Sequence, residues 1–203
     1  MATILDCASC DYIGLFEVVQ YFYKYLVDQC VESETHFVGI IAFSQGATFG
    51  TLLMWLATLT DDQFEEFVMT PHLDVVTKSG LYGLYRKYGQ VFRECLRIKA
   101  CVLMSGHLYP LPKQLKSSYC KFVAFCKGKR DAMNGKEQQQ WNKLQCASLH
   151  TMSPADKWVV MQRTKDLCGL FENVKIVEQP NGHVVYNNKY VSEFMTAKIL
   201  HSK

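Results

Sequence analysis

Ser44 is the residue of this chain best placed to act as a nucleophile. It follows the apolar run Val-Gly-Ile-Ile-Ala-Phe at 38–43 and precedes residues 46–59, whose apolar side chains recur at helical spacing. A strand that turns sharply into a helix at a serine is the context of a nucleophile elbow, which exposes the hydroxyl at the apex of the turn. Because such a turn is crowded, the positions two before and two after the serine should be small, and they are Ala42 and Gly46. A serine that merely caps a helix after a buried strand is the alternative interpretation.

A nucleophilic serine needs a base, and the base needs an acid that orients it. His183 follows the last predicted strand through Gln-Pro-Asn-Gly at 179–182, a turn-forming sequence. Asp131 follows a predicted strand at about 121–126 through a short turn. The chain order Ser, Asp, His, with each residue after a strand, is the order found around nucleophile elbows. We therefore predict Ser44 as nucleophile, Asp131 as acid and His183 as base.

Other residues compete for these roles with weaker arguments. His107 also lies near a strand end, after Ser-Gly at 105–106, but it precedes Asp131 and so breaks the expected order. Asp156 and Asp166 are weaker candidates for the acid because both fall inside a predicted helix. Cys7 and Cys10 have the CxxC spacing of a metal or redox pair, but no second pair follows them.

The elements that must position these groups alternate between helices and strands. Apolar spacing predicts helices at 15–30, at 46–59 and near the C-terminus around 190–200. A further helix is predicted from Ser153, as its N-cap, with Pro154 at its first position, to about Phe171. Nearly continuous apolar runs predict strands at about 37–43, 98–104, 121–126 and 174–178. Apolar strands separated by helices indicate an α/β fold with a mostly parallel sheet that is covered on both faces.

Length and charge fit one domain spanning residues 1–203. The net charge of +3 is too small to indicate a nucleic-acid partner, and no apolar run is long enough for a transmembrane segment. Nine cysteines without a secretory signal favour a reducing, cytoplasmic compartment. A polar and aromatic stretch at about 61–95 is predicted to form a helical, cap-like insertion over the site.

The motifs of the chain resemble those of the FSH-type serine hydrolases, a branch of the α/β-hydrolase fold. The resemblance runs from about residue 12 to 200 and rests on Ala-Phe-Ser-Gln-Gly-Ala at 42–47, Leu-Met-Ser-Gly at 103–106, Gly128 with Asp131, and Gly182 with His183. It implies a three-layer fold and an esterase or thioesterase that acts on small or acyl-chain esters without a metal or organic cofactor. It also implies that Ser44, Asp131 and His183 form the triad and that the backbone N–H of Gln45 is one oxyanion donor. Phe43, Ser105 and Gly106 are the expected substrate-binding residues.

The chain departs from that family's pattern before the elbow strand. The family has additional strands there and a His-Gly loop that supplies a second oxyanion donor, and no such loop occurs in residues 1–36. The fold is therefore expected to be N-terminally truncated, with the nucleophile strand as an open apolar edge that can pair with another chain. Three explanations stay open: a truncated form, a protein completed by a partner or by self-association, and a non-catalytic binding or scaffold protein.

Overall fold

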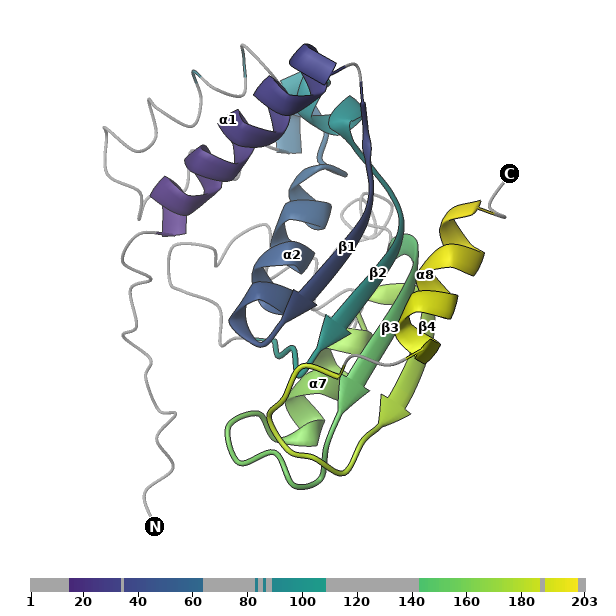
Figure 1. The fold of residues 1–203 in the computed structure, drawn as a ribbon. Coiled ribbons are helices and arrows are strands. Elements are labelled where there is room, and N and C mark those ends of the chain that lie inside the picture. Colours follow the sequence, from purple (N-terminus) through teal and green to yellow (C-terminus); the bar gives the residue numbers. More distant parts are fainter. Residues whose placement is uncertain are drawn as a thin grey trace, which may run out of the picture.

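The computed structural model describes residues 15–33, 35–63, 83, 86, 89–108, 143–186 and 189–200. The elements follow one another as α1 (Leu15–Ser33), β1 (Phe37–Phe43), α2 (Gln45–Leu56), β2 (Leu96–Met104), β3 (Leu144–Met152), α7 (Met161–Cys168), β4 (Phe171–Glu178) and α8 (Lys189–Leu200). Figure 1 shows the strands side by side with helices packed around them.

The four described strands form one parallel sheet in the order β1-β2-β3-β4. Because all strands run the same way, their carboxyl ends meet at one edge of the sheet (Figure 1). The register pairs Phe43 with Met104, Met104 with Thr151, and Met152 with Glu178. The segments that leave β1, β2, β3 and β4 therefore start next to one another, which is where parallel sheets commonly carry their sites.

Helices cover both faces of the sheet. This can be seen from β2, whose successive side chains pack alternately into two different core clusters. Cys101 and Leu103 pack into a cluster that includes residues of α1, α2 and α7, whereas Val102 and Met104 pack with Val191 of α8. Successive strand residues point to opposite faces, so these clusters lie on opposite sides of the sheet. The predicted α/β fold with helices on both faces of a parallel sheet is confirmed.

Helix α1 is held to the core by aromatic contacts with α2 and with the helical residues 89–95. The rings of Tyr23 and Phe92 stack with their centroids 4.3 Å apart, and those of Phe22 and Phe49 approach to 5.1 Å. Of the apolar positions that predict this helix from the sequence, Tyr23, Leu26, Val27 and Cys30 are buried, whereas Val18 is 43% exposed.

Several predicted elements differ from the observed ones. Strand β3 was not predicted, and the predicted strand at 121–126 lies outside the described residues. The helix predicted to begin at Ser153 is wrong over its first half, because residues 153–160 form a loop and α7 begins only at Met161. Most of the predicted cap at 61–95 lies outside the described residues. Within the cap, the described residues 61–63 and 89–95 are helical.

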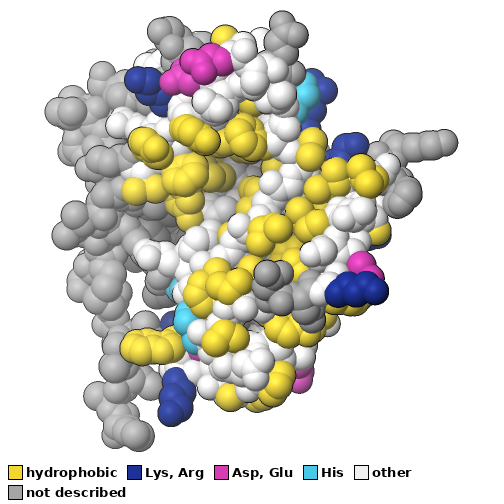
Figure 2. Space-filling view, in the orientation of Figure 1, with side chains coloured by type: hydrophobic (Ala, Val, Ile, Leu, Met, Phe, Trp, Pro, Cys, Tyr) yellow, Lys and Arg dark blue, Asp and Glu magenta, His cyan; other side chains and the backbone are white. Residues whose placement is uncertain are grey.

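Strand β1 is an outer strand of the described sheet, and its side chains are partly uncovered. Ile41 is 59% exposed, and Leu200 at the end of α8 is 72% exposed. Figure 2 shows apolar side chains gathered on this face, over β1 and α8. None of the helices in the described ranges is long and apolar enough to cross a membrane.

Candidate active site

Ser44 occupies the turn between β1 and α2 with backbone angles that few non-glycine residues adopt. Its φ is 52° and its ψ is −122°. Its N–H donates to the Met104 carbonyl of β2 at 2.8 Å, and its own carbonyl accepts the Ala47 N–H at 3.0 Å. Such a conformation costs on the order of 1–3 kcal/mol and persists where neighbouring bonds hold it, often at functional sites. The Ser44 side chain makes no capping hydrogen bond to α2, so its hydroxyl is not engaged as a helix cap.

The turn at Ser44 is crowded at Gly106 and not at Gly46, where the sequence predicts crowding. A Cβ added at Gly46 would meet nothing within 4 Å, so crowding does not explain this glycine and that part of the prediction is wrong. A Cβ added at Gly106, just after β2, would lie 2.7 Å from Leu167 Cδ2 and 2.8 Å from Ala47 Cβ. The close approach that requires a glycine therefore lies between the end of β2 and the start of α2.

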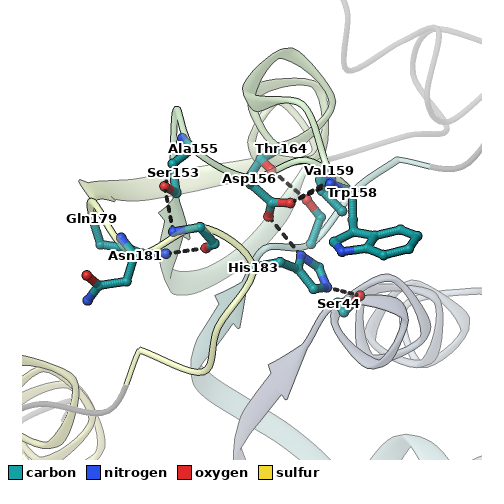
Figure 3. Close-up of polar contacts among 12 residues, drawn as sticks. Ser44, Ser153, Ala155, Asp156, Trp158, Val159, Thr164, Gln179, Asn181 and His183 are labelled. Carbon is teal, nitrogen blue, oxygen red and sulfur yellow. Dashed lines mark hydrogen bonds and ion pairs between the residues drawn. The ribbon is translucent and has the colours of Figure 1, made fainter.

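A hydrogen-bonded series joins Ser44, His183 and Asp156. His183 Nε2 lies 2.9 Å from Ser44 Oγ, and His183 Nδ1 lies 2.8 Å from Asp156 Oδ2 (Figure 3). The Asp156 side chain is 1% exposed and that of His183 is 19% exposed. A buried carboxylate behind an imidazole that faces a half-buried serine hydroxyl is the arrangement in which the imidazole can take the serine proton.

The Asp156 carboxylate is held in its ionised form by hydrogen bonds. Burial would raise its pKa, but the N–H of Val159, the His183 ring and the N–H of Trp158 outweigh burial and lower the pKa below its ordinary value. Its Oδ1 accepts the N–H groups of Trp158 at 2.8 Å and Val159 at 2.9 Å, which leaves Oδ2 for His183. The predicted acid Asp131 lies outside the described residues, so its role stays a prediction.

The loop 153–160 brings Asp156 to His183 because its polar side chains bind backbone N–H groups. Ser153 Oγ accepts the N–H groups of Ala155 and of Gly182, each at 3.1 Å. The sequence Ser-Pro-Ala-Asp is typical of a helix start, so sequence patterns alone favour Asp131 over Asp156 as the acid. Ser153 and Asp156 instead accept backbone N–H groups within a loop. If the strand at 144–152 is recognised, Asp156 falls just after a strand end, as the acid should.

Gln179 and Ser153 fix the segment that carries His183. The buried Gln179 side chain donates from Nε2 to the Gly182 carbonyl at 2.7 Å and accepts the Asn181 N–H at 2.6 Å. Gly182 has φ 74°, and a Cβ there would lie 3.3 Å from the Ala155 carbonyl. Figure 3 shows these contacts meeting between the Asp156 loop and the His183 loop. Sequence reasoning missed both positioning residues.

The other predicted site residues surround Ser44 but differ in access. Gln45 is exposed at the first position of α2, where a backbone N–H has no partner within the helix. The Phe43 ring lies 4.8 Å from the His183 ring. Ser105 is 1% exposed with φ 47°, and Gly106 is buried with its carbonyl accepting Thr164 Oγ1 at 2.8 Å. Ser105 and Gly106 are thus buried at the end of β2, next to the Ser44 turn.

Two of the competing titratable residues, His107 and Asp166, are among the described residues. His107 is 7% exposed, and burial, with Arg163 and His183 nearby, lowers its pKa below the ordinary value despite the opposing effect of Asp156. Asp166 lies on α7, where its Oδ1 accepts Gln162 Nε2. Among the described residues, no three His, Cys, Asp or Glu side chains gather closely enough to hold a metal ion.

A parallel α/β sheet with a strained serine, a histidine and a buried aspartate at its carboxyl edge defines the class of serine-hydrolase-like α/β proteins. Residues 10–195 match the family model described as serine hydrolase (FSH1), and the chain belongs to that family. No curated protein matches the chain significantly. Solved structures that match include one described as YahD with malic acid, at 13% identity and a TM-score of 0.49. The match covers 93% of this chain and 65% of that chain, so this chain spans about two thirds of its length.

Proposed function

We propose that this chain hydrolyses carboxylic ester or thioester bonds through an acyl-enzyme on Ser44. The observation that carries the proposal is the series from Ser44 Oγ through His183 to Asp156, with both contacts at hydrogen-bond distance. Membership of the serine hydrolase (FSH1) family supports the same chemistry. The substrate would be a small or acyl-chain ester, and no step requires a metal or an organic cofactor.

The geometry supports a two-stage mechanism. His183 Nε2 takes the proton of Ser44 Oγ as the oxygen attacks the ester carbonyl, and Asp156 stabilises the imidazolium through Nδ1. The protonated His183 then gives its proton to the leaving alcohol or thiol. Water, deprotonated by His183, attacks the acyl-enzyme and releases the acid.

The Gln45 N–H is the donor we propose for the oxyanion. It is the first N–H of α2, next to the Ser44 turn, and the helix N-terminus favours negative charge. One oxyanion donor typically contributes about 2.7–4 kcal/mol to transition-state stabilisation. The residues that supply a second donor in the family precede the elbow strand, and residues 1–14 lie outside the described ranges.

A binding or scaffold role is the second candidate, and the uncovered side of β1 is the observation that favours it. Ile41 is 59% exposed on this outer strand, and an outer strand presents unpaired backbone groups. We therefore keep self-association or partner pairing through β1 as a proposal. The cap at 61–95 and a reducing, cytoplasmic location also remain proposals; five free cysteines among the described residues agree with the latter.

Labelling with a fluorophosphonate probe, read by intact mass, tests the enzymatic proposal. The serine oxygen forms a bond to phosphorus and fluoride leaves, so one adduct is expected on the wild-type chain and none on Ser44→Ala or His183→Ala. Ser105→Ala is the matched control, because Ser105 shares the positive φ but is 1% exposed, and it should keep the adduct. A folded wild-type sample without an adduct would contradict the enzymatic role and favour the binding protein.

Release of acid from a series of esters and thioesters then separates the substrate classes. Turnover that disappears in Ser44→Ala identifies the bond that is cleaved. If Ser44→Ala loses turnover but still binds a partner that the wild type binds, the chain has both roles. If the wild type binds a partner and shows no turnover, the scaffold role is favoured.

A further inference from the structure

Four of the five cysteines in the described ranges lie in two neighbouring pairs. Cys101 of β2 and Cys146 of β3 have their sulfur atoms 3.9 Å apart, although 45 positions separate them in the chain. Cys30 of α1 lies close enough to Cys95 to add to the effect of burial, and together they raise the pKa of Cys95 to about 12. Cys168 is buried, and burial raises its pKa to about 12.

The sheet register places the first pair on one face of neighbouring strands. Cys101 is opposite Ser148, so Cys146 lies diagonally across, two residues nearer the start of β3. Both side chains contact the cluster beneath α2, where Met54 Sδ lies 3.8 Å from Cys146 Sγ. A disulfide requires a sulfur separation of about 2 Å. The two sulfur atoms must therefore approach by a little under 2 Å. Diagonal neighbours on adjacent strands lie about 7–8 Å apart, slightly beyond the usual Cα separation of a disulfide, so a small shift of the strands must accompany side-chain rotation.

The two members of the pair differ in access and acidity. Cys101 is fully buried, whereas Cys146 is partly exposed. The hydrogen bond from Cys101 lowers the pKa of Cys146 although desolvation opposes it, and the same contact, together with burial, raises the pKa of Cys101. Thiolate is the nucleophilic form, so Cys146 is the sulfur that a peroxide would meet first.

We propose that Cys146 and Cys101 form a reversible redox pair that a peroxide oxidises to an intrachain disulfide. The Cys146 thiolate attacks one peroxide oxygen, the O–O bond breaks, and after protonation the products are a Cys146 sulfenic acid and water (or an alcohol). The Cys101 thiol then attacks the Cys146 sulfur, the S–O bond breaks, and a second water leaves. Overall, two thiols lose two electrons and two protons, and one peroxide gains them. A dithiol reductant reverses the reaction by exchange.

The pair lies away from Ser44, on the body of the sheet. Cys101 is three residues before Met104, whose carbonyl holds the Ser44 N–H, and Cys146 is well before the Asp156 loop. The modification can thus be measured without reference to hydrolysis, and its test does not depend on the proposed function.

The experiment treats the folded, reduced chain with hydrogen peroxide, alkylates the remaining thiols and maps the tryptic peptides. Cleavage at lysine and arginine gives residues 100–113 and 144–157, each with one cysteine. We expect these two peptides to appear linked, two hydrogens lighter than their sum, and to separate after treatment with dithiothreitol. Cys168, and the pair of Cys30 and Cys95, should remain alkylated under the same dose.

Single variants test the order of the steps. In Cys101→Ala, Cys146 should accumulate as a sulfenic acid that dimedone traps, because the second thiol is missing. In Cys146→Ala, Cys101 should stay reduced, because it is fully buried. The proposal is overturned if folded wild-type chain leaves both cysteines alkylated at doses that oxidise free glutathione. It is also overturned if Cys146 passes to sulfinic acid without any linked peptide, or if the link forms only after denaturation.

Discussion

Replacement of Asp156 by Asn should abolish most of the nucleophilic activity of Ser44 while leaving the loop intact. Asp156 Oδ1 accepts the N–H groups of Trp158 and Val159, and an amide oxygen can do the same. The amide nitrogen would then face His183 Nδ1 and donate to it, which forces the ring proton onto Nε2. In that tautomer His183 cannot take the proton of Ser44, and the imidazolium also loses its buried counter-charge.

The size of the effect follows from these two losses. In serine proteases the same change lowers kcat by roughly 10⁴, which corresponds to about 5.5 kcal/mol of transition-state stabilisation. The side chain of Asp156 is 1% exposed and 2.8 Å from Nδ1, so water cannot substitute for it. We expect the rate of fluorophosphonate labelling and of ester hydrolysis to fall by about 10³–10⁴, with the free energy of unfolding changed far less.

Asp131→Asn is the decisive comparison, and Asp166→Asn is the control. Asp166 bonds Gln162 on α7 and should tolerate the change. If Asp131→Asn loses labelling and Asp156→Asn keeps it, the carboxylate that works with His183 is Asp131, and our reasoning from the contact at Nδ1 is refuted. If both variants lose labelling, Asp131 has a role in the site that is separate from the contact at His183 Nδ1.

Three further changes test the supports of the site. Gln179→Ala removes both side-chain bonds of the 179–182 turn and should lower kcat for ester hydrolysis about tenfold with KM little changed; an equal rise in KM would contradict a positioning role. Gly106→Ala should reduce the free energy of unfolding in urea by about 1–3 kcal/mol because the new Cβ overlaps Ala47, whereas Gly46→Ala, which meets nothing, should not. His150 is fully buried with both ring nitrogens unpaired, and burial lowers its pKa to about 4 from 6.5. The unfolded chain therefore takes up a proton first as pH falls, and stability should drop by about 3 kcal/mol between pH 6.5 and about 4; urea titrations of His150→Leu should lack this part of the slope.

The sequence predicts the elbow because its signals are local. A β-branched apolar run, a serine and a helical pattern follow one another within twenty residues, and β1, the strained Ser44 and α2 match them. The segment that carries His183 is also recognisable locally, since Gln-Pro-Asn-Gly after β4 is a turn-forming sequence. For both residues the local pattern indicates the turn, whereas the Met104 carbonyl and the Ser153 side chain, both distant in the sequence, hold it.

The Asp156 contact was missed because β3 does not look like a buried parallel strand. Such strands are usually almost entirely apolar, but β3 carries Ser148, His150 and Thr151 in its buried half. Without that strand, Asp156 has no strand end to follow, and Ser153 reads as a helix cap. One of the two Ser153 hydrogen bonds that hold this loop is with Gly182, 29 positions away in the sequence. A local sequence pattern cannot predict a contact between residues so far apart.

The position of the three site groups depends on hydrogen bonds that continue the sheet beyond its strands. The Ser44 N–H donates to Met104 of β2 at 2.8 Å, the Ser105 N–H donates to Thr151 of β3 at 2.9 Å, and the Gln179 N–H donates to Met152 at 2.9 Å. The loops that follow β1, β2 and β4 are thus anchored to the neighbouring strand by their first residues, and the Asp156 loop is tied to the last of them by the bond from the Gly182 N–H to Ser153 Oγ. Since interior strands resist opening more than isolated loops do, Ser44, His183 and Asp156 share one rigid support, although they come from three separate segments.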